Sequence, residues 1–165
     1  RIADMEPPHD LQMADIHLLH PMGEERLPIL DNSIGQPDLG QFTYSRKCLS
    51  VTGCCHLVRM QDLPIQAYDI RFSPTQFDDF DHDFGMFLKG SPCIYEGRVK
   101  VGHVQRSQLG ADKSPAQNAN VVGNKIKLDH KYTPEETQKA LAMNQDMVWQ
   151  DFLEKSVAIK HYLQD

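Results

Sequence analysis

The feature that most constrains the fold is a helix start signal at residues 133–136, followed by a stretch without glycine or proline. Thr133-Pro134-Glu135-Glu136 places a hydroxyl that can cap a helix, a proline at the first helical position and a glutamate at the third. The apolar residues that follow recur at gaps of seven and four: Leu141, Val148, Phe152, Ile159 and Leu163. This spacing predicts one long amphipathic helix over about residues 134–163. Such a helix must bury its apolar stripe, and we expect it to cover one face of a sheet.

Residues 41–105 have the pattern of that sheet. Apolar and polar residues alternate in three segments, and we expect strands at residues 66–72, 80–88 and 98–105. Residues 42–59 are rich in Thr, Val, Tyr and Cys, which predicts one or two further strands broken near Gly53. Glu96-Gly97 could make a tight turn into the last strand. Short strands with short turns predict an antiparallel sheet, which could be barrel-like.

The remaining segments have turn residues and little periodicity. Residues 1–40 predict an irregular arm with one short helix, which Asp10 would cap and which would run over about residues 11–19. Residues 106–132 predict a long polar loop. The fold class expected is therefore α+β, with residues 41–165 as one domain behind the 1–40 arm.

Composition and charge exclude several classes of protein. The chain has 165 residues and a net charge of -6, and no apolar run approaches the ~18 residues that a membrane span requires. Residues 97–131 hold seven basic and two acidic side chains but no aromatic residue, so we do not expect nucleic acid as a partner. The four cysteines show no C-x-x-C spacing and are too few for a disulfide scaffold. Reduced thiols in a soluble, intracellular protein are the expectation.

Two histidines fall on the apolar faces of expected strands. In a strand, His82 shares a face with Phe80 and Phe84, while Asp79, Asp81 and Asp83 face solvent. By the same alternation His103 shares a face with Val99 and Val101. Both imidazoles could line one cavity, bind a small-molecule ligand and act as a catalytic general base, or they could be ordinary core histidines.

A third histidine raises the question of a metal. His56 would complete a set of three ligands with His82 and His103. Three imidazoles leave a fourth position for water, which is the arrangement of catalytic zinc. A divalent metal ion is therefore a candidate cofactor, although no H-x-H or H-x-x-x-H pair aligns two of these residues in advance.

Two other functions fit parts of the sequence. A Cys/His hydrolase could use Cys54 or Cys55 as the nucleophile, His103 as the base, and Asn118 or Asp112 to orient it. Alternatively, the protein could be a non-catalytic subunit that docks onto a larger protein partner through residues 1–40. The leading hypothesis is a small-molecule-binding α+β domain whose inward histidines serve as base or as metal ligands.

Overall fold

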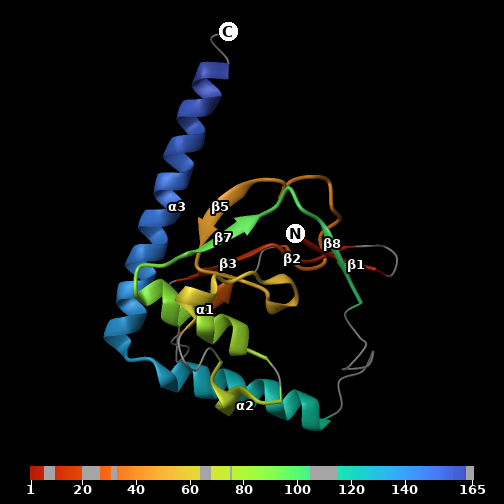
Figure 1. Cartoon of the computed structure of the whole chain (residues 1–165), viewed down its shortest axis with the longest axis vertical. Coiled ribbons are helices and arrows are strands. Elements are labelled where there is room, and N and C mark those ends of the chain that lie inside the picture. Colours follow the sequence, from red (N-terminus) through yellow and green to blue (C-terminus); the bar gives the residue numbers. More distant parts are fainter. Residues whose placement is uncertain are drawn as a thin grey trace.

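The fold is α+β, as a computed structural model describes it for residues 1–5, 10–19, 27–30, 33–63, 68–74, 76–104 and 115–162 (Figure 1). The strands are β1 (Ile2–Asp4), β2 (Leu11–Met13), β3 (Asp15–Leu18), β4 (Ile29–Leu30), β5 (Ser45–Cys48), β6 (Ser50–Val51), β7 (Cys93–Glu96) and β8 (Val101–His103). The helices are α1 (Asp78–Leu88), α2 (Pro115–Lys131) and α3 (Pro134–Tyr162), with short 3-10 turns η1 (Gly53–Cys55), η2 (Met60–Asp62) and η3 (Ile70–Phe72).

The strands in these ranges form three small sheets, with the orders β2-β1-β8, β4-β3-β6 and β5-β7. Four of the strand pairs are antiparallel, as expected, whereas β1 and β8 run parallel. The sheets do not close on one another within the described ranges, so the barrel-like alternative is wrong.

The first 40 residues contain strands where a short helix was expected. Residues 11–13 form β2 and residues 15–18 form β3, and β3 lies between β4 and β6. Leu11, Ile16 and Leu18 are buried in two separate core clusters. A short apolar run of this kind fits a helix or a buried strand equally well by its periodicity, and here pairing on both sides makes it a strand.

The segment 80–88, expected as a strand, is helix α1. Phe80 and Phe84 fit both the period of a strand and that of a helix, but Phe87 fits only the helix. These three rings lie in the larger core cluster, against Leu128 and Tyr132. The expected row of solvent-facing aspartates is therefore also wrong, since Asp81 and Asp83 are buried.

The other two expected strands are shorter than predicted or absent. Residues 70–72 are the 3-10 turn η3, and residues 64–67 lie outside the described ranges. Only Val101–His103 of the segment 98–105 forms a strand. Glu96-Gly97 does not join a hairpin, because β7 pairs with β5 and β8 pairs with β1. Residues 42–59 contain two strands, β5 and β6, but the break between them is at Leu49 and not near Gly53, which starts η1.

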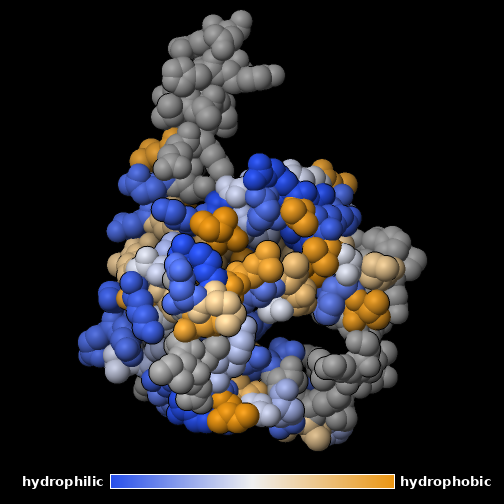
Figure 2. All heavy atoms as spheres, in the orientation of Figure 1, coloured by the Kyte–Doolittle hydropathy of each residue, from blue (hydrophilic) through white to orange (hydrophobic). Residues whose placement is uncertain are grey.

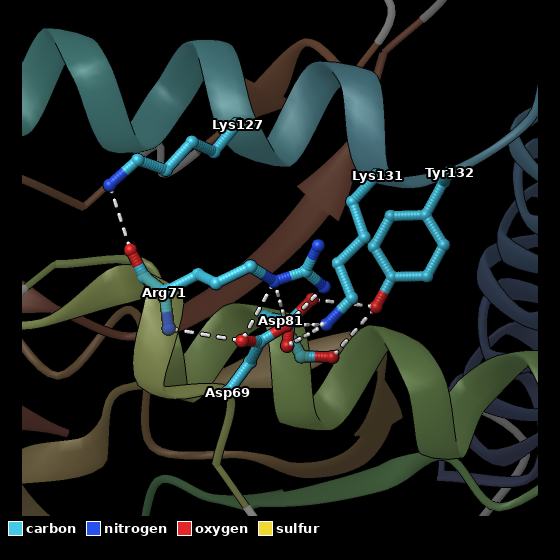
Figure 3. A network of polar contacts seen from close by, with 6 residues as sticks. All are labelled: Asp69, Arg71, Asp81, Lys127, Lys131 and Tyr132. Atoms are coloured by element: carbon cyan, nitrogen blue, oxygen red, sulfur yellow. Dashed lines mark hydrogen bonds and ion pairs between the residues drawn. The ribbon is translucent and has the colours of Figure 1, made fainter.

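Helix α2 occupies most of the segment predicted to be a loop, and a polar network joins it to α1 and η3 (Figure 3). Lys131 Nζ lies 2.6 Å from Asp81 Oδ2 and 2.8 Å from Asp69 Oδ2. The Tyr132 hydroxyl donates to Asp81 Oδ1 at 2.8 Å, and Lys127 Nζ donates to the Arg71 carbonyl. Lys131 therefore balances the negative charge of Asp81, and the Tyr132 hydroxyl adds a hydrogen bond. A buried carboxylate requires partners of this kind.

The long C-terminal helix is confirmed as α3, and its start has the predicted reciprocal cap. The Glu136 N–H donates to Thr133 Oγ1 at 3.2 Å, and the Thr133 N–H donates to Glu136 Oε2 at 2.9 Å. The helix packs against α1 and contacts β3 and β5, and its C-terminal part extends away from the body of the molecule (Figure 1). It therefore does not cover one sheet along its whole length. Over the described residues, no helix combines the length and the apolar character that crossing a bilayer demands.

Candidate metal centre

Three side chains from two parts of the chain converge beside α1. His82 and Asp83 are successive residues of α1, and His56 follows the turn η1. One ligating atom of each lies within 4.8 Å of those of the other two. His82 and Asp83 are buried, and the His56 side chain is only 10% exposed. The three side chains therefore expose only a small part of their surface to solvent.

Asp83 is the centre of the arrangement because its two oxygens have different partners. The Oδ1 atom lies 3.3 Å from His56 Nε2 and 3.2 Å from His82 Nδ1. The Oδ2 atom accepts hydrogen bonds from Ser50 Oγ at 2.8 Å and from the Val51 N–H at 3.1 Å. Strand β6 therefore holds the carboxylate so that its free oxygen faces both imidazoles.

The second nitrogen of each imidazole is left without a partner. His56 Nδ1 and His82 Nε2 are both buried and make no hydrogen bond within the described part of the chain. A buried polar atom without a partner costs roughly 1–3 kcal/mol. These are not the two nitrogens that face Asp83 Oδ1, so this cost marks them as candidates for contact with a ligand other than a metal bound at Asp83.

A close backbone contact places His56. The Gly53 N–H donates to Asp79 Oδ2 at 2.7 Å and so ties η1 to the first turn of α1. A Cβ atom at residue 53 would lie 3.1 Å from Asp79 Cβ, so a larger residue would press η1 away from α1. Burial raises the pKa of Asp79, and the N–H groups of Gly53 and Phe80 partly oppose this.

The distances suit a small metal ion. Ligand atoms at 2.0–2.1 Å from tetrahedral zinc are separated by about 3.3–3.4 Å, close to both of the distances from Asp83 Oδ1 to histidine nitrogens. The two imidazole ligand atoms lie within 4.8 Å of each other, so ligation by both needs a movement of less than about 1.5 Å. Ser50 and the Val51 N–H would act as the outer partners that orient a ligating carboxylate.

An open cavity of about 430 Å³ adjoins the cluster, and His56, His82 and Asp83 lie in its wall. Most of the other lining residues are apolar; they include Val51, Leu57, Met86, Pro92, Val99 and Val101. Its volume falls within the range of small-molecule sites. A few convergent polar groups in a mostly apolar wall are also typical of such sites.

Two of the three predicted histidines are brought together, and one is not. His56 and His82 meet with ring centroids 5.8 Å apart. His103 lies on β8, where its Nδ1 is 2.7 Å from Gln12 Oε1, and it is not in the metal-ligand cluster found among the described residues. The third member of the cluster is Asp83 rather than His103.

Sequence reasoning missed Asp83 because it assigned the segment to a strand. A helix turns about 100° per residue, so Asp83 lies only about 40° around α1 from the core residue Phe87. The apolar residues Phe77, Phe80, Phe84 and Phe87, with gaps of three, four and three, were the available signal.

Cys54, one of the two cysteines considered as a Cys/His nucleophile, shows no sign of activation. Cys54 is exposed, and desolvation raises the pKa of its thiol rather than lowering it. Burial also raises the pKa of Cys93 far above its usual range, and the charge of Asp83 adds to this effect. A reactive thiolate needs the opposite shift. Asn118 lies on α2, and Asp112 is outside the described ranges.

Comparison with protein-family models, with curated proteins and with solved structures found no match to this chain.

Proposed function

We propose that the protein binds a divalent transition metal, with Zn²⁺ as the first candidate, through His56, His82 and Asp83. The observation that carries this proposal is the convergence of two imidazoles on one carboxylate oxygen whose companion oxygen is held by Ser50 and the Val51 N–H. Two histidines and one carboxylate are a donor set used by catalytic zinc and by non-haem iron.

Three protein ligands leave at least one coordination position for a small molecule. A metal held there acts as a Lewis acid on an oxygen of the bound ligand, or activates a water molecule. The adjoining cavity supplies space for that ligand. The function we propose is therefore metal-dependent binding of a small molecule, with hydrolysis or a related addition of water as the reaction class that this donor set supports best.

A second function is favoured by the unpartnered nitrogen of His82. If His82 donates its Nδ1 proton to Asp83 Oδ1, then Nε2 carries a lone pair that no described group uses. An imidazole oriented by a carboxylate in this way is a general base. This alternative requires no metal, and the same cavity would hold the substrate.

Zinc titration of metal-free protein tests the first function. After treatment with a chelator, isothermal titration calorimetry should give one Zn²⁺ per chain, and Co²⁺ should give the visible absorption of a four-coordinate site. His56→Gln and Asp83→Asn should each weaken Zn²⁺ binding by at least about 100-fold, since each removes a direct ligand. His103→Gln is the matched control, because His103 lies with Gln12 outside the cluster, and it should bind Zn²⁺ as the unchanged protein does.

Stoichiometric Zn²⁺ binding that persists in both ligand variants would contradict the proposed site. A protein that binds no divalent metal would leave the general-base alternative. That alternative predicts that long-range ¹H–¹⁵N NMR finds His82 protonated at Nδ1 and free at Nε2, with no change on addition of Zn²⁺.

A further inference from the structure

The cavity beside the proposed metal centre has an apolar wall and an apolar rim. Leu57, Ile94 and Val99 line it and are 97%, 59% and 56% exposed. On the face of the molecule shown in Figure 2, apolar side chains gather over and beside β7. Apolar residues exposed at the mouth of a cavity gain free energy when a ligand covers them, so this mouth favours a ligand with an apolar part.

The proposed metal centre in the cavity wall favours an anionic head group. Two neutral imidazoles and one carboxylate leave a bound dication with a net charge of about +1. Arg59 also lines the cavity, and the acidic lining residue Glu96 is paired with Arg98, with Arg98 Nη2 2.5 Å from Glu96 Oε2. A singly charged oxygen anion on the metal would balance the charge of the centre.

From these two features we infer that the cavity takes an amphiphilic monoanion, with a carboxylate-like oxygen head group and an apolar chain. The head group completes the coordination of the metal, and the chain runs along apolar wall residues such as Val51, Met86 and Val101 toward the exposed Leu57. This inference rests on the proposed metal centre and names the class of ligand that it serves.

A chain-length series tests the inference directly. Acetate, butanoate, hexanoate and octanoate are titrated into the full chain loaded with Zn²⁺, and their dissociation constants are measured by calorimetry. Burial of each added methylene should tighten binding between about 2- and 4-fold until the cavity is filled. Octanol has the same chain length without the charge and should bind at least about 10-fold more weakly than octanoate. Metal-free protein should lose the preference for octanoate over octanol.

A pair of surface variants tests the path of the chain. Leu57→Ser changes a side chain that is almost fully exposed, so the fold should tolerate it. It should weaken octanoate binding by about 2- to 10-fold and leave acetate binding unchanged. Val122→Ser is the matched control, because Val122 is 59% exposed on α2 and does not line this cavity. It should change neither affinity.

The outcomes separate this inference from the function on which it rests. Zinc binding at the three ligands together with equal affinities for acetate and octanoate would overturn the inference and leave the metal centre intact. Equal binding of octanoate with and without Zn²⁺ would overturn the placement of the head group. Absence of Zn²⁺ binding, measured before any ligand is added, would overturn the proposed metal centre and the inference with it.

Discussion

Ser50 is a buried residue with a defined task at the candidate centre. Its hydroxyl donates to Asp83 Oδ2, and the Val51 N–H reaches the same atom. Loss of an outer hydrogen bond of this kind typically lowers metal affinity 10- to 100-fold. We therefore expect Ser50→Ala to weaken Zn²⁺ binding by about that factor in a calorimetric titration. Ser45→Ala, a change on the exposed part of β5, is the control, and equal affinities in the two variants would contradict the orienting role.

Gly53 is the second residue whose identity the centre requires. An added Cβ atom would press against Asp79 and displace η1, which carries the chain to His56. We expect Gly53→Ala to weaken Zn²⁺ binding while the thermal unfolding temperature changes little, because the affected turn is exposed. Gly90 follows the C-terminal end of α1, has a φ of 85°, and has no atom within 4 Å of an added Cβ. Gly90→Ala should therefore strain the backbone and lower stability, and leave zinc affinity unchanged.

Asp69 should make stability depend on acid pH. Its contact with Arg71, together with Lys131, holds the pKa of its carboxyl well below the ordinary value of 3.8 (Figure 3). A depressed pKa stabilises the fold above the unfolded-state value, and this contribution is lost as pH falls toward the folded-state value. Denaturant titrations should therefore show Asp69→Asn less stable than the unchanged protein at pH 6. The difference should shrink between about pH 4 and pH 2, whereas a difference that stays constant over that range would exclude this linkage.

Among the elements, α3 offers the most direct test of what the sequence encodes locally. Thr133 Oγ1 accepts a hydrogen bond from the Glu136 N–H, so Thr133→Ala removes one of the two capping hydrogen bonds of the helix. The expected loss is about 1 kcal/mol in the free energy of unfolding, measured with denaturant. Thr133→Ser keeps the hydroxyl and should recover most of the loss. An alanine variant as stable as the serine variant would show that the cap contributes nothing.

The long helix could be predicted because its signals are local. A capping hydroxyl, a proline and a glutamate act within one turn, and no distant segment is needed to interpret them. The sequence where α2 begins holds a similar start signal, Ser114-Pro115-Ala116-Gln117, but the helix also contains Asn124, a residue type common in turns, at a buried position. Asn124 is tolerated there because its Nδ2 donates to the Phe72 carbonyl at 2.7 Å, a contact that no local pattern contains.

Helix α1 shows how one wrong assignment changes the predicted site. As a strand, its alternation turned His82 inward and Asp83 outward, whereas the helix buries both. His82 was therefore selected for a reason that does not hold in the structure, and its partner Asp83 was set aside. His56 could be named from its residue type alone, but its place beside α1 depends on Gly53 and Asp79.

For the molecule as a whole, the first strands are built into the same sheets as the rest of the chain. β1 pairs with β8, and β3 pairs with β6. Ile2, Ala3 and Leu11 are buried. We therefore expect a chain lacking residues 1–40 to lose cooperative unfolding in denaturant, because β6 and β8 would be left with unpaired edges and exposed core residues.

The same deletion tests the alternative of a docking arm. An arm used only to hold a protein partner could be removed while the remaining domain keeps a cooperative transition and its Zn²⁺ site. That result would favour the subunit interpretation and would show that the pairing of β1 with β8 contributes little to stability. Circular dichroism and zinc calorimetry on the truncated chain would distinguish the two.

The parallel pairing of β1 with β8 also sets an order of events during protein synthesis. About 100 residues separate Ile2–Asp4 from their partners Val101–His103. A ribosome adds about 5–20 residues per second, so β1 leaves the exit tunnel about 5–20 s before the strand that completes its sheet. During that interval Ile2 and Ala3 lack their β8 partner, while β5, β6 and α1 already have enough chain to assemble. Codon choice between residues 5 and 101 would therefore influence how long the first strand is open to wrong pairings with neighbouring nascent chains.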